Sequence, residues 1–344
     1  MILSVKEAYI LLVLVKNEVN KILSKRKMLL ITVIMLILVF LFAYGQNYQY
    51  KNTLDKYSKT TTESGDIPWQ SLQKQQIQDL KNRLDRIDTP ESSKDSINIR
   101  IQQNQYYLDN NINPITPSAA KFSIKLMEQS ISVLLPLLII LLASDSVCGE
   151  FSAKTIKVLL TRAVPRWKVL LSKYLALLIL FSIVVLEMAV LSIFISGLFF
   201  NNWGFYEPVA TGFSSASGTL DISNIIKVTQ IQYLVLIYSL GWFVSIVIGT
   251  ISFMVSVLAQ NTATSIGIMM ATLVGGGFLR LFLADWPAIK YFFAINLSLP
   301  QYLTGSYTPI SGMSLNFSTL VLLTWGIGAF IISFVVFIKR DILV

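Results

Sequence analysis

Apolar residues are gathered in six blocks that alternate with polar segments along the chain. The blocks cover residues 28–44, 125–144, 169–200, 231–258, 263–283 and 315–338. A helix needs about 20 mostly apolar residues to cross the hydrocarbon core of a bilayer, and within lipid a helix satisfies its own backbone hydrogen bonds. The pattern therefore predicts an all-α integral membrane protein with six transmembrane helices.

Residues 1–27 are amphipathic rather than uniformly apolar. On a helical wheel, the apolar side chains fall within one arc and polar side chains occupy the other side. The apolar arc consists of Leu11, Leu12, Val15, Val19, Ile22 and Leu23. The segment ends in the basic run Lys25, Arg26 and Lys27. An apolar face bordered by cations is typical of a helix lying in the membrane interface; a cytoplasmic helix packed on protein is the alternative.

Residues 45–124 form a polar insertion that is too rich in Gln, Asn, Lys and Asp to enter a bilayer. Apolar residues recur at helical spacing between Pro68 and Ile87. Thr89, Pro90 and Glu91 then supply an N-cap, a proline at the first helical position and an early acid for a second helix. We therefore expect a helical-hairpin insertion.

The short polar segments set the orientation. Lys and Arg accumulate in residues 1–27, in the loop 145–168 and in the tail 339–344, whereas the connections 201–230 and 284–314 hold few. Cytoplasmic loops carry an excess of Lys and Arg. We therefore expect both termini to be cytoplasmic and the insertion and the two long connections to be extracytoplasmic, in the plasma (inner) membrane of a bacterium.

Composition limits the chemistry further. Charged residues make up 14% of the 344 residues, against about 25% in soluble domains. Histidine is absent, which excludes His-based triads and imidazole relays. The single cysteine, Cys148, cannot form an internal disulfide. The net charge of +9 comes from cations dispersed along membrane edges, so no nucleic-acid partner is indicated. We expect neither catalysis nor a cofactor bound by this chain.

The loop between the second and third blocks carries a motif. Its marked positions are Glu150, Lys154-Thr155, Leu159-Leu160, Pro165-Arg166 and Lys173 at the start of the next block. These positions resemble the loop of permease subunits of ABC type-2 exporters, although that family often has Gly in place of Lys154. The resemblance extends to the plan of an amphipathic N-terminal helix, six spans, a tight turn between the fourth and fifth spans and a short basic tail.

The resemblance implies that a separate ATPase subunit, carrying ATP and Mg, docks on this loop, and that a second permease copy or a sister permease completes the transporter. Phe151 and nearby apolar residues would enter a groove of the ATPase, while Glu150, Lys154 and Arg166 would pair with charges at its rim. A solvated loop at the membrane surface is the alternative. Residues 149–155 only partly match a phosphate-binding loop, because Ala153 replaces the second glycine.

Three charged residues lie within or beside the spans. Glu187 is in the middle of the third block, where an ionisable side chain indicates either a functional group or a structural hydrogen bond. Arg280 and Asp285, near the outer end of the fifth block, are expected to form an interfacial anchor or an ion pair. Gly275, Gly276 and Gly277 allow close helix packing or a break in the same block.

The resemblance therefore implies a subunit of an ATP-driven exporter that moves an amphipathic, peptide, drug or lipid-like substrate outward. An ion-gradient-driven secondary transporter is one alternative, and a non-transporting membrane sensor or assembly protein is another. Dependence of transport on ATP would separate them.

Overall fold

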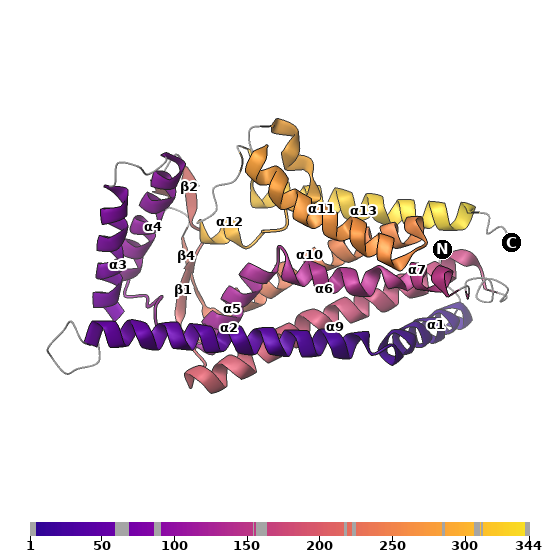
Figure 1. Cartoon of the computed structure of the whole chain (residues 1–344), viewed down its shortest axis with the longest axis horizontal. Helices are drawn as coiled ribbons and strands as arrows, with labels where there is room; N and C mark the ends of the chain where they lie inside the picture. The colour runs from indigo at the N-terminus through magenta and orange to yellow at the C-terminus, as the bar shows by residue number, and fades with distance from the viewer. Residues whose placement is uncertain are drawn as a thin grey trace.

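The computed structural model describes residues 5–58, 69–85, 91–153, 155, 164–216, 219–221, 225–283, 286–305, 310 and 312–340. Long helices run along its longest axis (Figure 1). A pair of shorter helices stands at one end, and both termini lie at the other. The paired short helices and the two termini are therefore at opposite ends of the molecule.

Within the described residues, six helices are long and apolar enough to cross a membrane. They are α2 (Lys27–Ser58), α6 with α7 (Leu134–Ala143 and Asp145–Ser152), α9 (Arg166–Phe200), α10 (Gln230–Ala259), α11 (Thr262–Phe282) and α13 (Leu315–Lys339). Large apolar side chains such as Leu29, Phe40 and Leu186 are exposed along them. Lipid is the medium in which such faces are stable, so the chain is a multi-pass membrane protein built of helices, as predicted.

The second span begins later than predicted. Residues 125–130 belong to a separate helix, α5 (Ala119–Ser130), and α6 starts only at Leu134. Between them, Val133 has φ −132° and ψ −63°, outside the helical region. Pro136 explains the break, because it lacks an N–H and its ring collides with the carbonyl of the residue four positions earlier. In the first turn of α6 the same proline is tolerated.

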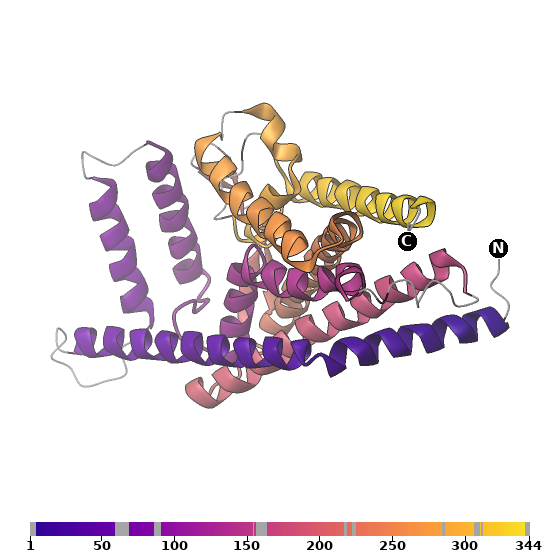
Figure 2. The same ribbon diagram turned by 45° about the vertical axis from the view of Figure 1, so that its right-hand side comes forward.

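The first span continues into the polar insertion. α2 does not end with the apolar block at residue 44 but reaches Ser58. α3 (Trp69–Leu84) and α4 (Glu91–Asp109) pack against each other. Figure 2 shows this pair beside the end of α2, away from both termini.

The connection 201–230 holds strands that the all-α prediction missed. β1 (Pro208–Thr211) pairs antiparallel with β4 (Ile226–Thr229), with Pro208 opposite Thr229. β2 (Ser214–Ala216) pairs with β3 (Thr219–Asp221). These strands are three or four residues long, too short to show the alternation of apolar and polar residues that predicts a strand.

α10 lies at the centre of the bundle and packs against α5, α6, α9, α11 and α13. A Cβ added at Gly249 would overlap the Phe181 ring, so glycine is what lets α9 and α10 approach. α11 is continuous through its three glycines, and a Cβ at Gly276 would overlap Ala294. Close packing is therefore the role of Gly276. The 3-10 helices η1 (Pro287–Tyr291) and η2 (Phe293–Ile295) and the short α12 (Gln301–Thr304) link α11 to α13.

Buried hydroxyls join the helices at two levels. Ser123 on α5 lies 2.6 Å from Ser192 Oγ on α9, and both contact the Tyr238 hydroxyl of α10, at 2.8 and 3.0 Å. Further along, Ser144 Oγ lies 2.9 Å from Ser252 Oγ. Hydrogen bonds between helices of this kind hold membrane bundles together where the hydrophobic effect is weak.

Candidate functional site

A cluster of charged side chains joins three helices. Two of them, α1 (Val5–Ser24) and α7, lie at the end of the molecule where the termini are marked in Figure 1. Glu150 comes from α7, Lys173 from the start of α9, and Glu18 and Lys21 from α1. Lys173 Nζ donates to Glu150 Oε1 at 2.6 Å and to Glu18 Oε2 at 2.9 Å. Lys21 Nζ donates to the same oxygen of Glu150. One carboxylate therefore ties α7 to both α1 and α9.

The centre of this cluster is removed from solvent. The side chain of Lys173 is 1% exposed and that of Glu150 is 3% exposed, whereas Lys21 is 39% exposed. Burial lowers the pKa of Lys21, but its hydrogen bond to Glu150 and the surrounding carboxylates raise it above the ordinary lysine value, so Lys21 is charged at neutral pH. Buried charges are costly unless they are paired, so each member of the cluster depends on the others.

A second ionic link lies beside the first. Asp145 Oδ2 accepts from Lys25 at 2.7 Å and from Lys27 at 2.8 Å. Its other oxygen accepts from the hydroxyl of Thr262, at 3.2 Å. The start of α7 is thereby fixed to the turn between α1 and α2 and to the first residue of α11.

α7 is also bound to α10 through neutral groups. Cys148 Sγ donates to the carbonyl of Ser256 at 2.9 Å, and Ser256 Oγ donates to the carbonyl of Ser144 at 2.8 Å. The cysteine is fully buried and is not in a disulfide. It acts here as a packing residue and a weak donor.

The structure brings some of the predicted coupling residues into contact. The Thr155 N–H donates to the Glu150 carbonyl at 3.0 Å. Arg166 Nη1 donates to the carbonyl of Arg340 at 2.9 Å. The guanidinium of Arg340 lies 5.8 Å from the centre of the Phe151 ring. The end of α13 therefore borders the same loop.

One expectation about this loop is corrected. Glu150 does not stand at an exposed rim, because Lys173 and Lys21 reach its carboxylate from neighbouring helices and bury it. Pro165 precedes the first residue of α9 in an extended conformation. Lys154, Leu159 and Leu160 lie outside the described residues.

The other candidate residues are remote from the cluster. Glu187 lies on α9 about 21 Å along the helix from Lys173, at 1.5 Å per residue. It is half-buried, and its Oε2 has no hydrogen-bond partner in the described part of the chain. Arg280 is in the last turn of α11, and Asp285 lies outside the described residues, so the expected pair is not tested. In the described residues, no group of three or more His, Cys, Asp or Glu is placed to hold a metal ion.

Sequence reasoning singled out Glu150 and Lys173 in the cluster. It missed Glu18 and Lys21, the other two members, and Asp145 beside them. Lys173 stands out in the sequence as a cation in an apolar block. Glu18, Lys21 and Asp145 are not distinguished from solvated surface residues by their neighbours. Glu18 and Lys21 are three positions apart and therefore share a helix face, which is the one local signal that relates them.

The sequence is similar to a family model and to two bacterial proteins. The model is described as "Protein of unknown function (DUF2705)" and matches residues 96–343. "Uncharacterized protein YhcI" of Bacillus subtilis (strain 168) is 29% identical over 277 residues, which are 78% of this chain and 84% of the relative. "Uncharacterized membrane protein YdbK" of the same strain is 29% identical over 217 residues, 62% of this chain and 80% of the relative.

Proposed function

The chain belongs to the family described as "Protein of unknown function (DUF2705)". We propose that it is the permease subunit of an ATP-driven ABC type-2 exporter, because its loop resembles that of such subunits. A separate ATPase subunit binds ATP and Mg and docks on the loop after α7. Hydrolysis by that partner drives outward movement of an amphipathic, peptide, drug or lipid-like substrate. A second copy or a sister permease completes the assembly.

The observation that carries this proposal is the ionic cluster around Glu150. Lys173 and Lys21 hold α7 to α9 and α1, and Asp145 holds the start of α7 to the turn before α2. A force applied to the loop after α7 would therefore reach three helices at once through short charged contacts. This is the mechanical property that a coupling loop needs.

The distribution of charge supports the orientation. The cluster and the basic residues near it lie at the end of the molecule with both termini, and the α3–α4 pair lies at the other end (Figure 1). We infer that the first end is cytoplasmic and the second extracytoplasmic, in a bacterial plasma membrane. α1 packs on α9 with Val15 buried, while Tyr9 and Leu12 are exposed. Its free apolar side would enter the membrane interface.

Affinity purification tests the proposal. The full-length tagged chain is purified from its native membrane in mild detergent, co-eluting proteins are identified, and ATP hydrolysis is measured with and without vanadate. We expect a partner with a complete phosphate-binding loop and vanadate-sensitive hydrolysis. A chain that elutes alone and shows no ATP dependence contradicts the assignment.

A double substitution locates the docking surface. Leu159→Asp with Leu160→Asp should abolish co-elution of the ATPase, because two carboxylates cannot enter an apolar groove. Ile226→Asp is the matched control, since this exposed residue of β4 lies at the other end of the molecule. Equal co-elution of both variants would place the docking surface elsewhere.

Glu187 favours a second candidate, an ion-driven carrier. Glu187 belongs to the middle of α9, and its Oε2 has no hydrogen-bond partner among the residues that the structure describes. Carboxylates within spans serve as ion or proton sites in such transporters. Transport should then stop when an uncoupler is added and continue when ATP is depleted. Glu187→Gln should abolish this transport. Transport that needs ATP and survives Glu187→Gln excludes this candidate.

A further inference from the structure

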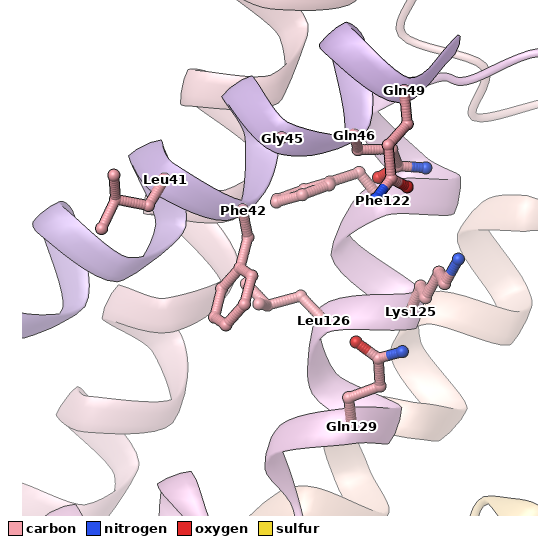
Figure 3. A pocket seen from close by; sticks show the side chains of 9 residues that line it. All are labelled: Leu41, Phe42, Gly45, Gln46, Gln49, Phe122, Lys125, Leu126 and Gln129. Carbon is pink, nitrogen blue, oxygen red and sulfur yellow. The ribbon is translucent and has the colours of Figure 1, made fainter. Parts of the chain in front are cut away.

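A groove lies at the opposite end of the bundle from the ionic cluster, between α2 and α5 (Figure 3). Both helices pack against α9, and a cavity of about 260 Å³ is left between them. In Figure 3, Phe42 of α2 extends toward Leu126 of α5, and the Phe122 ring lies close to Gly45. No part of the proposed coupling mechanism uses this groove.

The groove is apolar at one end and polar at the other. Leu41, Phe42 and Leu126 line the apolar end. Gln46, Gln49 and Lys125 line the polar end. Along α2 the change falls where the apolar block gives way to the polar insertion, which is where the hydrocarbon core of a bilayer meets its headgroups. A ligand that fits both ends must itself be amphipathic.

Gly45 keeps the groove open. A Cβ built at this position would meet no atom within 4 Å. Glycine is a poor helix former, yet here it lies inside the 32-residue helix α2. Unlike Gly249, it does not serve close contact between helices within this chain. Its effect is to leave room on the wall of the groove.

The polar end has more cations than carboxylates around it. A second cavity of about 450 Å³ shares the lining residues Gln46 and Lys125 with it and is also lined by Arg100, Lys121 and Glu128. Lys121 is paired with Glu207 at 2.6 Å. Glu128 accepts from the Tyr233 hydroxyl at 3.0 Å.

In the part of the chain that the structure describes, two cations, Arg100 and Lys125, form no close ion pair, although Glu128 attracts Lys125 from one turn further along α5. The side chains of Gln46 and Gln49 lie together beside the groove (Figure 3) and supply neutral donors and acceptors. The polar end therefore suits an anionic group that accepts several hydrogen bonds, which is the chemistry of a phosphate diester.

We propose that this groove binds one molecule of an anionic phospholipid. The headgroup phosphate is held by Lys125 and the glutamine amides, and the acyl chains leave along Leu41, Phe42 and Leu126 into the bilayer. The two cavities accommodate a headgroup and the start of the chains rather than a whole lipid, so the groove is a lateral site open to the membrane. The proposal goes beyond ATP-driven export and does not depend on it, because the site is complete in this chain alone.

Native mass spectrometry of the full-length chain tests this site. The protein is delipidated in a neutral detergent and titrated with phosphatidylglycerol, phosphatidylcholine or free glycerol 3-phosphate. We expect one tightly bound phosphatidylglycerol per chain. Its binding should be about fivefold tighter than that of phosphatidylcholine, which corresponds to about 1 kcal/mol for one lysine near an anionic headgroup. Free glycerol 3-phosphate should not compete at the same concentrations, because it cannot use the apolar end.

Two substitutions separate the two ends of the groove. Lys125→Gln should remove the fivefold preference, because it weakens binding of phosphatidylglycerol more than binding of phosphatidylcholine, whose choline cation already offsets the phosphate charge. Gly45→Trp should abolish tight binding of both lipids by filling the cavity. Gly275→Trp is the matched control, because a Cβ there also meets nothing within 4 Å and it lies on the separate helix α11. This control should bind lipid as the unaltered protein does.

The proposal is overturned by any of three results. They are equal affinity of the two lipids for the unaltered protein, a preference that survives Lys125→Gln, or competition by glycerol 3-phosphate at the concentration of the lipid. Thermal unfolding of each variant shows whether Gly45→Trp is folded. If it is not, Lys125→Gln decides alone, since the side chain of Lys125 is exposed and a substitution at an exposed position usually has little effect on stability.

Discussion

Replacing Lys173 by Met should destabilise the protein strongly. The substitution keeps the length of the side chain and removes its charge, so that Glu150 and Glu18 lose their contacts of 2.6 and 2.9 Å. Breaking a buried pair costs about 3–5 kcal/mol, since one charge is left buried without its partner. Lys21 still reaches Glu150, so we expect the lower end of this range, about 3 kcal/mol.

A double-mutant cycle shows whether this loss comes from the pair. Glu150→Gln alone removes one carboxylate and leaves Lys173 with Glu18. In Lys173→Met with Glu150→Gln, no carboxylate at position 150 is left to be buried unpaired. The double variant should therefore be more stable than the sum of the two single losses predicts, by about 1–2 kcal/mol, within the range measured for residues in contact.

The free energy of unfolding can be measured in mixed micelles, with the helical circular dichroism signal followed as SDS replaces a mild detergent. Lys16→Met is the control, because Lys16 is an exposed lysine of α1 and such substitutions usually change stability by less than about 0.5 kcal/mol. If Lys173→Met behaves like Lys16→Met, or if the cycle is additive, the cluster does not hold α7 to α9 and α1, and the argument for force transmission fails.

Two further predictions concern packing. Gly249→Ala should lower the free energy of unfolding by about 1–3 kcal/mol, the usual cost of overpacking, because the added Cβ overlaps Phe181; Gly328→Ala, where a Cβ meets nothing within 4 Å, should be neutral in the same micelle titration. Cys148, which is fully buried, should react with a maleimide only after denaturation in SDS; rapid labelling of the folded protein would show that α7 separates from α10.

The spans were predictable because a helix that crosses the hydrocarbon core of a bilayer has to be long and apolar. Four of the six predicted apolar blocks, all except the first two, coincide with observed helices to within three residues at each end. The first block begins within one residue of α2, but α2 continues to Ser58. The second span begins later than predicted because Pro136 favours the first turn of a new helix, α6, and sequence alone did not say whether that proline kinks a helix or begins one. The prediction missed the short strands β1 to β4, because their pairing depends on chain reversals within a polar connection.

The candidate site was predictable only in part. Glu150 was identified through the family resemblance, but we expected its carboxylate to pair with charges on the ATPase. Its real partners lie 23 and 129 positions away, at Lys173 and Lys21. Such pairing depends on how α1, α7 and α9 pack, and no local pattern encodes it. The groove was invisible for the same reason, since Gly45 and Lys125 become neighbours only when α2 and α5 are both packed on α9.

Because α2 is one continuous helix, a tilt at one of its ends produces a larger displacement at the other. From Lys27, which is bound to Asp145, to Ser58 it contains 32 residues, a rod of about 48 Å at 1.5 Å per residue. If α2 tilted by about 10° around its Lys27 end, its Ser58 end would move by about 8 Å, given a rod of that length. Motion at one face of the membrane would thus arrive enlarged at the other, with no relay of side chains between them.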